Sequence, residues 1–241
     1  MSDAVLQRRE AGVLHLTLNR PEVRNAMNSA MVEGLRDALA QAESDGDVRA
    51  VVLRGTGGHF CAGADLKSLA GAPRDVESMA AMNARFGELC VAFANTPITT
   101  VAVLEGTVMG GGFGLACVAD VAIAGETTLF RLPETSIGVV PAQIAPFLVE
   151  RLGYSEAKRL AVTGGRIDAR TALALRLVHE VHEGHAALEA ALQRVLHELL
   201  QCAPGAVAAT KALIAKARFT PPAALVQEAA MVFARAATGA E

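Results

Sequence analysis

The most constraining feature of this chain is a pair of short apolar segments that each run directly into a glycine-rich loop. Residues 50–54 (AVVLR) precede a loop over residues 55–63, and residues 99–104 (TTVAVL) precede a loop over residues 106–112. Short, continuously apolar segments are typical of strands that are covered on both faces, as in parallel sheets. A helical pattern follows each loop, so we expect a repeated strand–loop–helix unit.

The pattern of apolar residues in the rest of the chain also predicts alternating strands and helices. Residues 13–18 alternate as a strand does, and Asn28 or Ser29 can cap a helix that runs to about residue 43. The apolar face expected for that helix consists of Met31, Leu35, Ala38, Leu39 and Ala42. Further helices are predicted over residues 76–94, 113–119, 186–201, 206–216 and 223–236, and further strands over residues 121–124 and 178–181. The pattern becomes wholly helical near residue 190, so we expect a core over residues 1–190 and a helical region over residues 191–241.

Composition excludes several classes of protein. The chain has 241 residues, 52% hydrophobic and 20% charged, which is ample for a buried core, and its net charge of −3 gives no reason to expect a nucleic-acid partner. The four cysteines lack CxxC spacing, so reduced thiols are expected. Neither a signal peptide nor a run of ~18 apolar residues is present, so we expect no membrane partner and a cytoplasmic location.

The two glycine-rich loops carry the first chemical prediction. Small residues at Ala62, Gly63 and Ala64 allow a ligand to approach the backbone, and the second loop exposes N–H groups at the positive end of a helix dipole. Two such loops facing each other would form an oxyanion hole, in which one donor contributes about 3–4 kcal/mol of transition-state stabilisation. Each loop taken alone could be only a tight turn. A Walker A loop is excluded because Gly-Lys-[Ser/Thr] does not occur, and a dinucleotide-binding loop is disfavoured by the glycine spacing.

At this point the sequence resembles a known family. The segments that carry the resemblance are residues 20–27 (RPEVRNAM), 60–66 (FCAGADL), 109–112 (MGGG), 120–124 (DVAIA) and 130–134 (FRLPE). Their order and spacing resemble the crotonases, the enoyl-CoA hydratase/isomerase superfamily, over roughly residues 10–215. The resemblance implies an α/β fold, a crotonase-like spiral of ββα units with a C-terminal helical layer. It also implies an acyl-CoA substrate and assembly as a homotrimer or a dimer of trimers.

The same resemblance implies which residues form the site. The oxyanion donors would be the N–H groups of Ala64 and Gly111. The residues implied along the CoA moiety and the substrate are Arg24, Ala26, Ala62, Gly63, Asp65, Leu66 and Gly110. For Arg24 the chemistry agrees, because a cation near a loop suits a CoA phosphate, although a solvated arginine is the alternative.

Glu134 is the predicted acid/base. Two-carboxylate hydratases of this family carry one Glu shortly after the triple glycine and a second twenty positions later; here Gly114 and Glu134 hold these positions. A desolvated Glu has a raised pKa, which suits a group that both takes and gives a proton, whereas a surface carboxylate at a helix start is the alternative. One carboxylate suffices for syn hydration of a 2-enoyl thioester and also for a 1,3-proton shift between 3-enoyl and 2-enoyl thioesters.

The expected function is therefore an enoyl-CoA hydratase, a lyase that needs no metal or redox cofactor. Residues 138–147 and 112–115 resemble bacterial hydratases that act on branched glutaconyl-CoA esters, and Arg131 is a candidate partner for the second carboxylate of such a substrate. The alternatives are a 3-enoyl-CoA to 2-enoyl-CoA isomerase that uses the same Glu134, and a non-catalytic acyl-CoA-binding or RNA-binding relative.

Several other signals are not expected to carry chemistry. His179 and His182 lack the HExxH spacing and would point to opposite faces of a strand, so a solvated strand is favoured over a metal site. Glu105 is expected to be a turn carboxylate, and Asp120 to be buried and bonded to backbone. The final residues are expected to lack the C-terminal segment with which crotonases usually contact CoA.

Overall fold

The computed structural model describes residues 3–65 and 75–239 as an α/β fold. Its strands are β1 (Val5–Glu10), β2 (Val13–Leu18), β3 (Ala50–Gly55), β4 (Thr99–Leu104), β5 (Thr107–Met109), β6 (Val121–Gly125), β7 (Leu129–Arg131), β8 (Arg166–Asp168) and β9 (Glu180–His182). Its α-helices are α1 (Ser29–Ser44), α3 (Val76–Asn95), α4 (Gly111–Val118), α5 (Ala145–Thr163), α6 (Ala169–Ala174), α7 (Gly184–Leu200), α8 (Pro204–Ala217) and α9 (Pro222–Thr238). Short 3-10 turns form η1 (Pro21–Val23) and η2 (Glu134–Ile137).

The strands form two sheets. The larger sheet has the order β1-β2-β3-β4-β6-β9, with parallel pairing except between β1 and β2, and the smaller sheet has the order β5-β7-β8. The prediction of buried, largely parallel strands is therefore confirmed. Because β4 and β6 of the larger sheet are followed by β5 and β7 of the smaller one, and helices follow these pairs, the chain winds as a spiral of ββα units.

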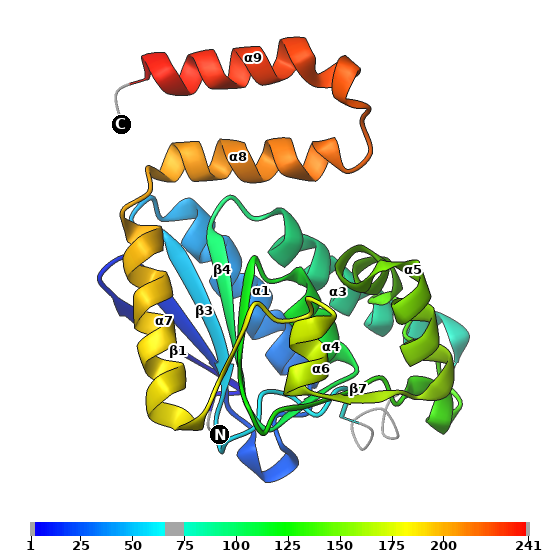
Figure 1. Ribbon diagram of the computed structural model, residues 1–241. Coiled ribbons are helices and arrows are strands. Elements are labelled where there is room, and N and C mark those ends of the chain that lie inside the picture. Colours follow the sequence, from blue (N-terminus) through cyan, green and yellow to red (C-terminus); the bar gives the residue numbers. More distant parts are fainter. Residues whose placement is uncertain (1–2, 66–74, 240–241) are drawn as a thin grey trace.

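Helices cover both faces of the larger sheet (Figure 1). Helix α7 packs against alternate residues of the strands, Val52, Val103 and Ile123 among them, which are buried with Leu188 and Leu192 in one apolar cluster. The intervening strand residues face a larger cluster formed with α1, α3, α4 and α5. Coverage on both faces explains why these strands read as continuous apolar runs.

Helix α1 confirms its prediction in detail. The side chain of Asn28 caps it by accepting a hydrogen bond from the Met31 N–H group at 3.0 Å, so Asn28 and not Ser29 is the cap. The buried residues of α1 are the five that the sequence pattern predicts: Met31, Leu35, Ala38, Leu39 and Ala42.

Strand β1 is an element that the sequence pattern did not predict. Only Val5 of its six residues is buried, so the alternation that marks a half-buried strand is missing. Its register, from Val5 opposite Leu18 to Glu10 opposite Val13, comes from pairing with β2. An edge strand of this kind is decided by backbone pairing and not by its own side chains.

Helices α8 and α9 extend beyond the sheet, with α9 farthest from it (Figure 1). The predicted boundary at residue 190 stays a prediction, and helix α7 runs across it. The four cysteines are free, as predicted. Within the part of the chain that the structure describes, no helix is both long and apolar enough to cross a membrane.

Candidate active site

Backbone hydrogen bonds join the two glycine-rich loops side by side. The N–H group of Phe60 donates to the Glu105 carbonyl at 2.9 Å, that of Cys61 to Thr107 at 2.9 Å, and that of Met109 back to Cys61 at 2.9 Å. The first loop thereby runs parallel to the start of the second, with Cys61 opposite Val108. The two loops lie at the carboxyl ends of β3 and β4, where parallel sheets commonly place ligand sites.

The two predicted oxyanion donors follow the point where these loops touch. A Cβ atom added to Gly63 would lie 3.2 Å from the Met109 carbonyl oxygen and 3.7 Å from Gly110 Cα, so the backbones are in close contact. Ala64 comes next in one loop and is exposed, and Gly111 comes next in the other and opens helix α4. Neither N–H group donates a hydrogen bond within the described residues. Both are therefore available to an oxygen of a ligand.

The second loop requires glycine for steric reasons. Gly110 has φ 51°, and its N–H group donates to the Arg131 carbonyl at 3.0 Å. A Cβ atom on Gly111 would overlap the Cε atom of Met27 and lie 3.1 Å from Phe86 Cζ. The side chains of Met27 and Phe86 thus pack against the first turn of α4.

Glu134 is placed beside the donors, at the start of η2. Its Oε1 atom would lie 3.1 Å from a Cβ atom added to Gly110. Its Oε2 atom is buried and has no hydrogen-bond partner among the described residues. Burial raises the pKa of this carboxyl group, and the hydrogen bond from its own N–H group offsets the rise in part. A carboxyl group with a raised pKa next to vacant N–H donors has the properties expected of an acid/base.

No room exists for a second carboxylate at residue 114. A Cβ atom on Gly114 would overlap Cγ2 of Ile144 and lie 3.1 Å from Ile144 Cβ, with Phe86 Cζ 3.7 Å away. Ile144 is only 3% exposed, so it is firmly packed there. Sequence reasoning noted the missing Glu but did not identify the side chain that takes its place.

The residues predicted to contact CoA lie on the segment between η1 and α1 and on the two glycine-rich loops. Arg24 is exposed, with φ 51°, and its carbonyl accepts the Ala62 N–H group at 3.0 Å. Ala26 is buried, and the next residue, Met27, pairs with Ala64 as an isolated bridge. Backbone contacts therefore join the segment that holds Arg24 and Ala26 to the segment that holds Ala62 and Ala64. Their contact with CoA stays a prediction.

Asp65 has a structural partner. Its carboxylate is 2.8 Å from the Arg20 guanidinium, and the residue is 7% exposed. The same guanidinium donates to the Ala26 carbonyl at 2.6 Å. The pair joins the loop that holds Ala64 to the preceding segment, so any contact of Asp65 with substrate comes in addition to this one. Leu66 lies outside the described residues.

Asn25 is a supporting residue for which sequence reasoning predicted no role. It is fully buried with φ 57°, and its amide donates to the carbonyls of Thr56 (2.9 Å) and His59 (2.7 Å) while accepting the Arg20 N–H group (2.8 Å). Asn tolerates the left-handed region better than most residues, which is the signal that could have singled it out.

The signals set aside in the sequence have structural partners. His179 Nδ1 accepts the Ala122 N–H group at 2.9 Å, and His182 lies 2.8 Å from Glu180. Glu105 lies 3.5 Å from the Arg54 guanidinium. Asp120 accepts from the Thr100 N–H group, as predicted, but it is half-buried and also pairs with Lys211, which corrects the expectation of full burial. The Arg131 guanidinium donates to Gly164 and Ser136.

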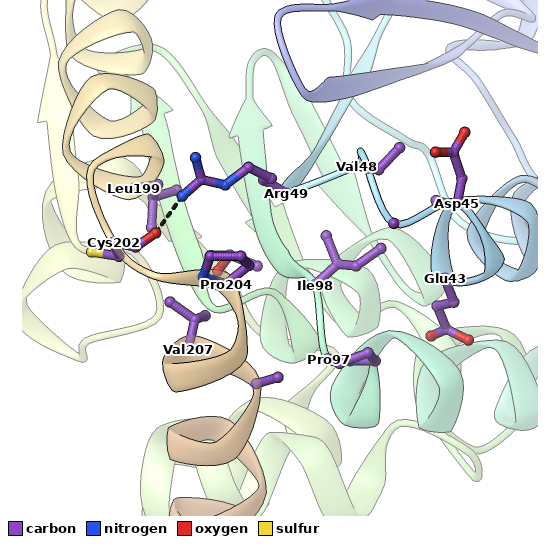
Figure 2. A pocket seen from close by; sticks show the side chains of 14 residues that line it. Glu43, Asp45, Val48, Arg49, Pro97, Ile98, Leu199, Cys202, Pro204 and Val207 are labelled. Carbon is purple, nitrogen blue, oxygen red and sulfur yellow. Dashed lines mark hydrogen bonds between the residues drawn. The ribbon is translucent and has the colours of Figure 1, made fainter. Parts of the chain in front are cut away.

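A separate cavity of about 170 Å³ lies at the opposite edge of the sheet, by the amino ends of β3 and β4. Figure 2 shows Arg49 reaching across it to donate to the Cys202 carbonyl, between Leu199 and Pro204. The N–H donors and Glu134 lie at the carboxyl ends of the same strands, so this cavity is separate from the candidate active site.

Comparison with known proteins agrees with this geometry. A family model described as enoyl-CoA hydratase/isomerase matches residues 8–239. The enoyl-CoA hydratase ACTT6 of Alternaria alternata is 34% identical over 87% of this chain and 68% of its own length. The 2,3-dehydroadipyl-CoA hydratase of Escherichia coli (strain K12) is 34% identical over 80% of this chain and 74% of its own length.

Solved structures show the same fold. Pseudomonas aeruginosa AtuE is 51% identical and superposes with a TM-score of 0.96, covering 99% of this chain and 93% of that one. An enoyl-CoA hydratase/isomerase from Marinobacter aquaeolei is 45% identical with a TM-score of 0.94, covering 99% of this chain and 92% of that one.

Proposed function

Because this chain belongs to the enoyl-CoA hydratase/isomerase family and is an enzyme of the hydratase type, we propose that it adds water across the 2,3-double bond of an enoyl-CoA thioester. The observation that carries the proposal is the position of the Glu134 carboxylate, which lies against Gly110 next to the residue of one N–H donor. Among the described residues, its buried Oε2 atom has no hydrogen-bond partner, and the N–H groups of Ala64 and Gly111 donate to none. A carboxylate in this position can exchange a proton with a ligand whose carbonyl oxygen is held by the donors.

The proposed reaction is a proton relay through one side chain. Glu134 accepts a proton from water as the water oxygen bonds to C3, and the electron pair of the double bond moves toward the thioester carbonyl. The N–H groups of Ala64 and Gly111 stabilise the resulting enolate oxygen. Glu134 then returns the proton to C2, which regenerates the carboxylate. The relay uses these groups alone and calls for no metal or redox cofactor.

The thioester would be held along the first loop. Arg24 is exposed and is joined to no carboxylate in the ion pairs found among the described residues, so its guanidinium is free to meet a CoA phosphate. Ala62 and Gly63 present little side-chain bulk near the backbone donors. A branched glutaconyl-type acyl group remains our proposed substrate, with Arg131 as the candidate partner of its second carboxylate. Assembly as a homotrimer or a dimer of trimers, in the cytoplasm, belongs to the same proposal.

One observation favours a second candidate reaction. Because Ile144 takes the space at Gly114, Glu134 is the one proton-transfer group that we place in the site among the described residues, and a single base also suffices for isomerisation between 3-enoyl and 2-enoyl thioesters. The same Glu134 and the same donors would serve. Product analysis separates the two reactions, because only hydration yields a 3-hydroxyacyl thioester.

The test is the loss of conjugated enoyl-thioester absorbance with crotonyl-CoA and with 3-methylglutaconyl-CoA. We expect turnover by the native protein and a loss of at least 100-fold in kcat in Glu134→Gln, since a general acid/base contributes about 10²–10⁴-fold. Glu88→Gln makes the same change at an exposed glutamate; it is the matched control and should keep full activity. Turnover that survives in Glu134→Gln would exclude this mechanism.

A further inference from the structure

The segment from Glu134 to Ile144 contacts the first half of helix α4 twice, once through each of its two terminal residues. At its start, the Glu134 carboxylate lies against Gly110. At its far end, just before helix α5, Ile144 fills the space beside Gly114. Gly111, which supplies one of the N–H donors, lies between these two glycines. The distance from the carboxylate to the donor therefore depends on how this segment is seated on α4.

The contact at Gly114 is tight and involves the stiff part of the Ile144 side chain. The atoms that a Cβ at residue 114 would meet first are Cγ2 and Cβ of Ile144, which cannot move away by rotating a flexible end. β-branched side chains have few rotamers, so Ile144 holds one position. Only 3% of the residue is exposed, so other side chains surround Ile144 closely.

The neighbouring residue is seated in the same way on another helix. A Cβ atom on Gly87, in the middle of α3, would overlap Oε1 of Gln143 and lie 2.7 Å from its Cδ. The Gln143 amide then donates to Asn83 Oδ1 at 3.0 Å. Glycine is unfavourable inside a helix, so its presence at Gly87 indicates a packing requirement. Two consecutive side chains thus pack against glycines of two different helices, Ile144 through its branched Cβ and Gln143 through the end of its longer side chain.

Backbone hydrogen bonds lie along the segment between Glu134 and Ile144 and reach the main-chain carbonyl of Glu134. The Val139 N–H group donates to the Glu134 carbonyl at 3.0 Å, and the Ala145 N–H group donates to the Pro141 carbonyl at 3.0 Å. The Leu148 N–H group bonds to the Ile144 carbonyl at 2.9 Å and continues the chain into α5. Glu134 and Ile144 therefore lie at the two ends of one short segment with internal hydrogen bonds, and we expect a shift at Ile144 to alter the position of η2.

We propose that Ile144 is a positioning residue for this active site: its side chain, packed beside Gly114, fixes the Glu134 carboxylate relative to the Gly111 N–H group. The inference rests on the proposed role of Glu134 as the proton-transfer group. Displacement of a reacting group by about 1 Å can lower a rate about 100-fold, so the contact should be visible in kcat.

The first experiment compares Ile144→Ala with Ile144→Val, which keeps Cγ2, and with Leu192→Ala, a buried leucine of the cluster on the other face of the sheet. We expect kcat to fall at least tenfold in Ile144→Ala with KM changed less than threefold, and to stay within threefold of native in Ile144→Val. Leu192→Ala should lower Tm and leave kcat within twofold. Equal kcat values in Ile144→Ala and Leu192→Ala would overturn the proposal.

A reciprocal experiment tests the contact itself. Gly114→Ala should lower kcat at least tenfold because the new methyl group displaces Ile144. In the double variant Gly114→Ala/Ile144→Ala the overlap is removed, so kcat should be no lower than in Ile144→Ala alone. Losses that multiply would mean that the two residues act independently and would contradict the proposal. If Ile144→Ala fails to fold, Gln143→Ala, which empties the space at Gly87, replaces it.

Exchange of the C2 protons of butanoyl-CoA in D₂O, followed by NMR, separates this inference from the proposed function. That exchange needs the base and the oxyanion donors but no hydration. If hydration is absent while exchange occurs and falls in Ile144→Ala, the hydratase proposal fails and the positioning role stands. If the native protein catalyses neither reaction, both proposals fall.

Discussion

At the scale of the residue, the carboxyl group of Glu134 lies in surroundings that disfavour its charged form. Its Oε2 atom is buried without a partner among the described residues, and burial raises the pKa of the carboxyl group. A raised pKa in the folded chain means that folding favours the protonated form. Any stability that this group contributes is therefore fully present below the pKa of the unfolded chain and is lost as pH rises through the folded pKa.

This sign predicts the stability of Glu134→Gln. Because glutamine is neutral and similar in shape, and burial disfavours the charged form of the native carboxyl group, the variant should be more stable than the native protein at pH 8. The difference should disappear near pH 4, below the ordinary pKa of about 4.3 for glutamate. Urea unfolding at the two pH values measures it, with the exposed variant Glu88→Gln as control. A native protein that is more stable than Glu134→Gln at pH 8 would contradict this account of the carboxyl group.

At the scale of elements, helix starts decide the geometry of the site. Helix α4 begins at Gly111 with no side-chain cap, so its first N–H groups are left for a ligand. Helix α1 begins in the opposite way, with Asn28 satisfying the Met31 N–H group.

The cap of α1 gives a prediction of its own. Asn28→Ala should lower the free energy of unfolding by about 1 kcal/mol, because an N–H group at the helix start loses its partner. Ser29→Ala should change it by only a few tenths of a kcal/mol, since Ser29 is the first helical residue and not the cap. Chemical denaturation of both variants compares the two positions, and equal losses would show that the cap was misidentified.

At the scale of the whole molecule, helices α8 and α9 and the turn between them carry several exposed apolar side chains. Phe219 is 78% exposed and Phe233 74%, and Ile214 and Met231 are also more than half exposed. Within the described residues, α8 buries none of its side chains and α9 buries Leu225 alone. Exposed apolar patches of this kind mark interaction sites, which supports the proposed homo-oligomer.

Light scattering on the purified protein tests this proposal. We expect a mass that is a multiple of 25.0 kDa, and a shift toward the monomer in the double variant Phe219→Glu/Phe233→Glu. Val76→Glu, which changes another exposed apolar residue far from α8 and α9 in the chain, should leave the mass unchanged. A monomeric native protein would exclude the homo-oligomer.

The sequence by itself determined the elements that have a strong local pattern. Strands β2, β3 and β4 and helix α1 follow from apolar runs, alternation and a cap, because neighbouring residues decide these features. The two glycine loops and Glu134 were also recognisable, since their residue types and spacing carry the chemistry and the family resemblance. The buried Oε2 atom of Glu134, and the N–H groups of Ala64 and Gly111 that donate to no described residue, are compatible with the predicted acid/base and oxyanion donors.

Only the tertiary structure decided the contacts between segments that are distant in sequence. Three-residue strands such as β5 and β8 are too short to show a period, and β1 shows none, so pairing with other strands defines them. Arg20 proved to be the partner of Asp65, and Ile144 proved to fill the space at Gly114. These contacts depend on which side chains the fold brings together, and no local propensity encodes that choice.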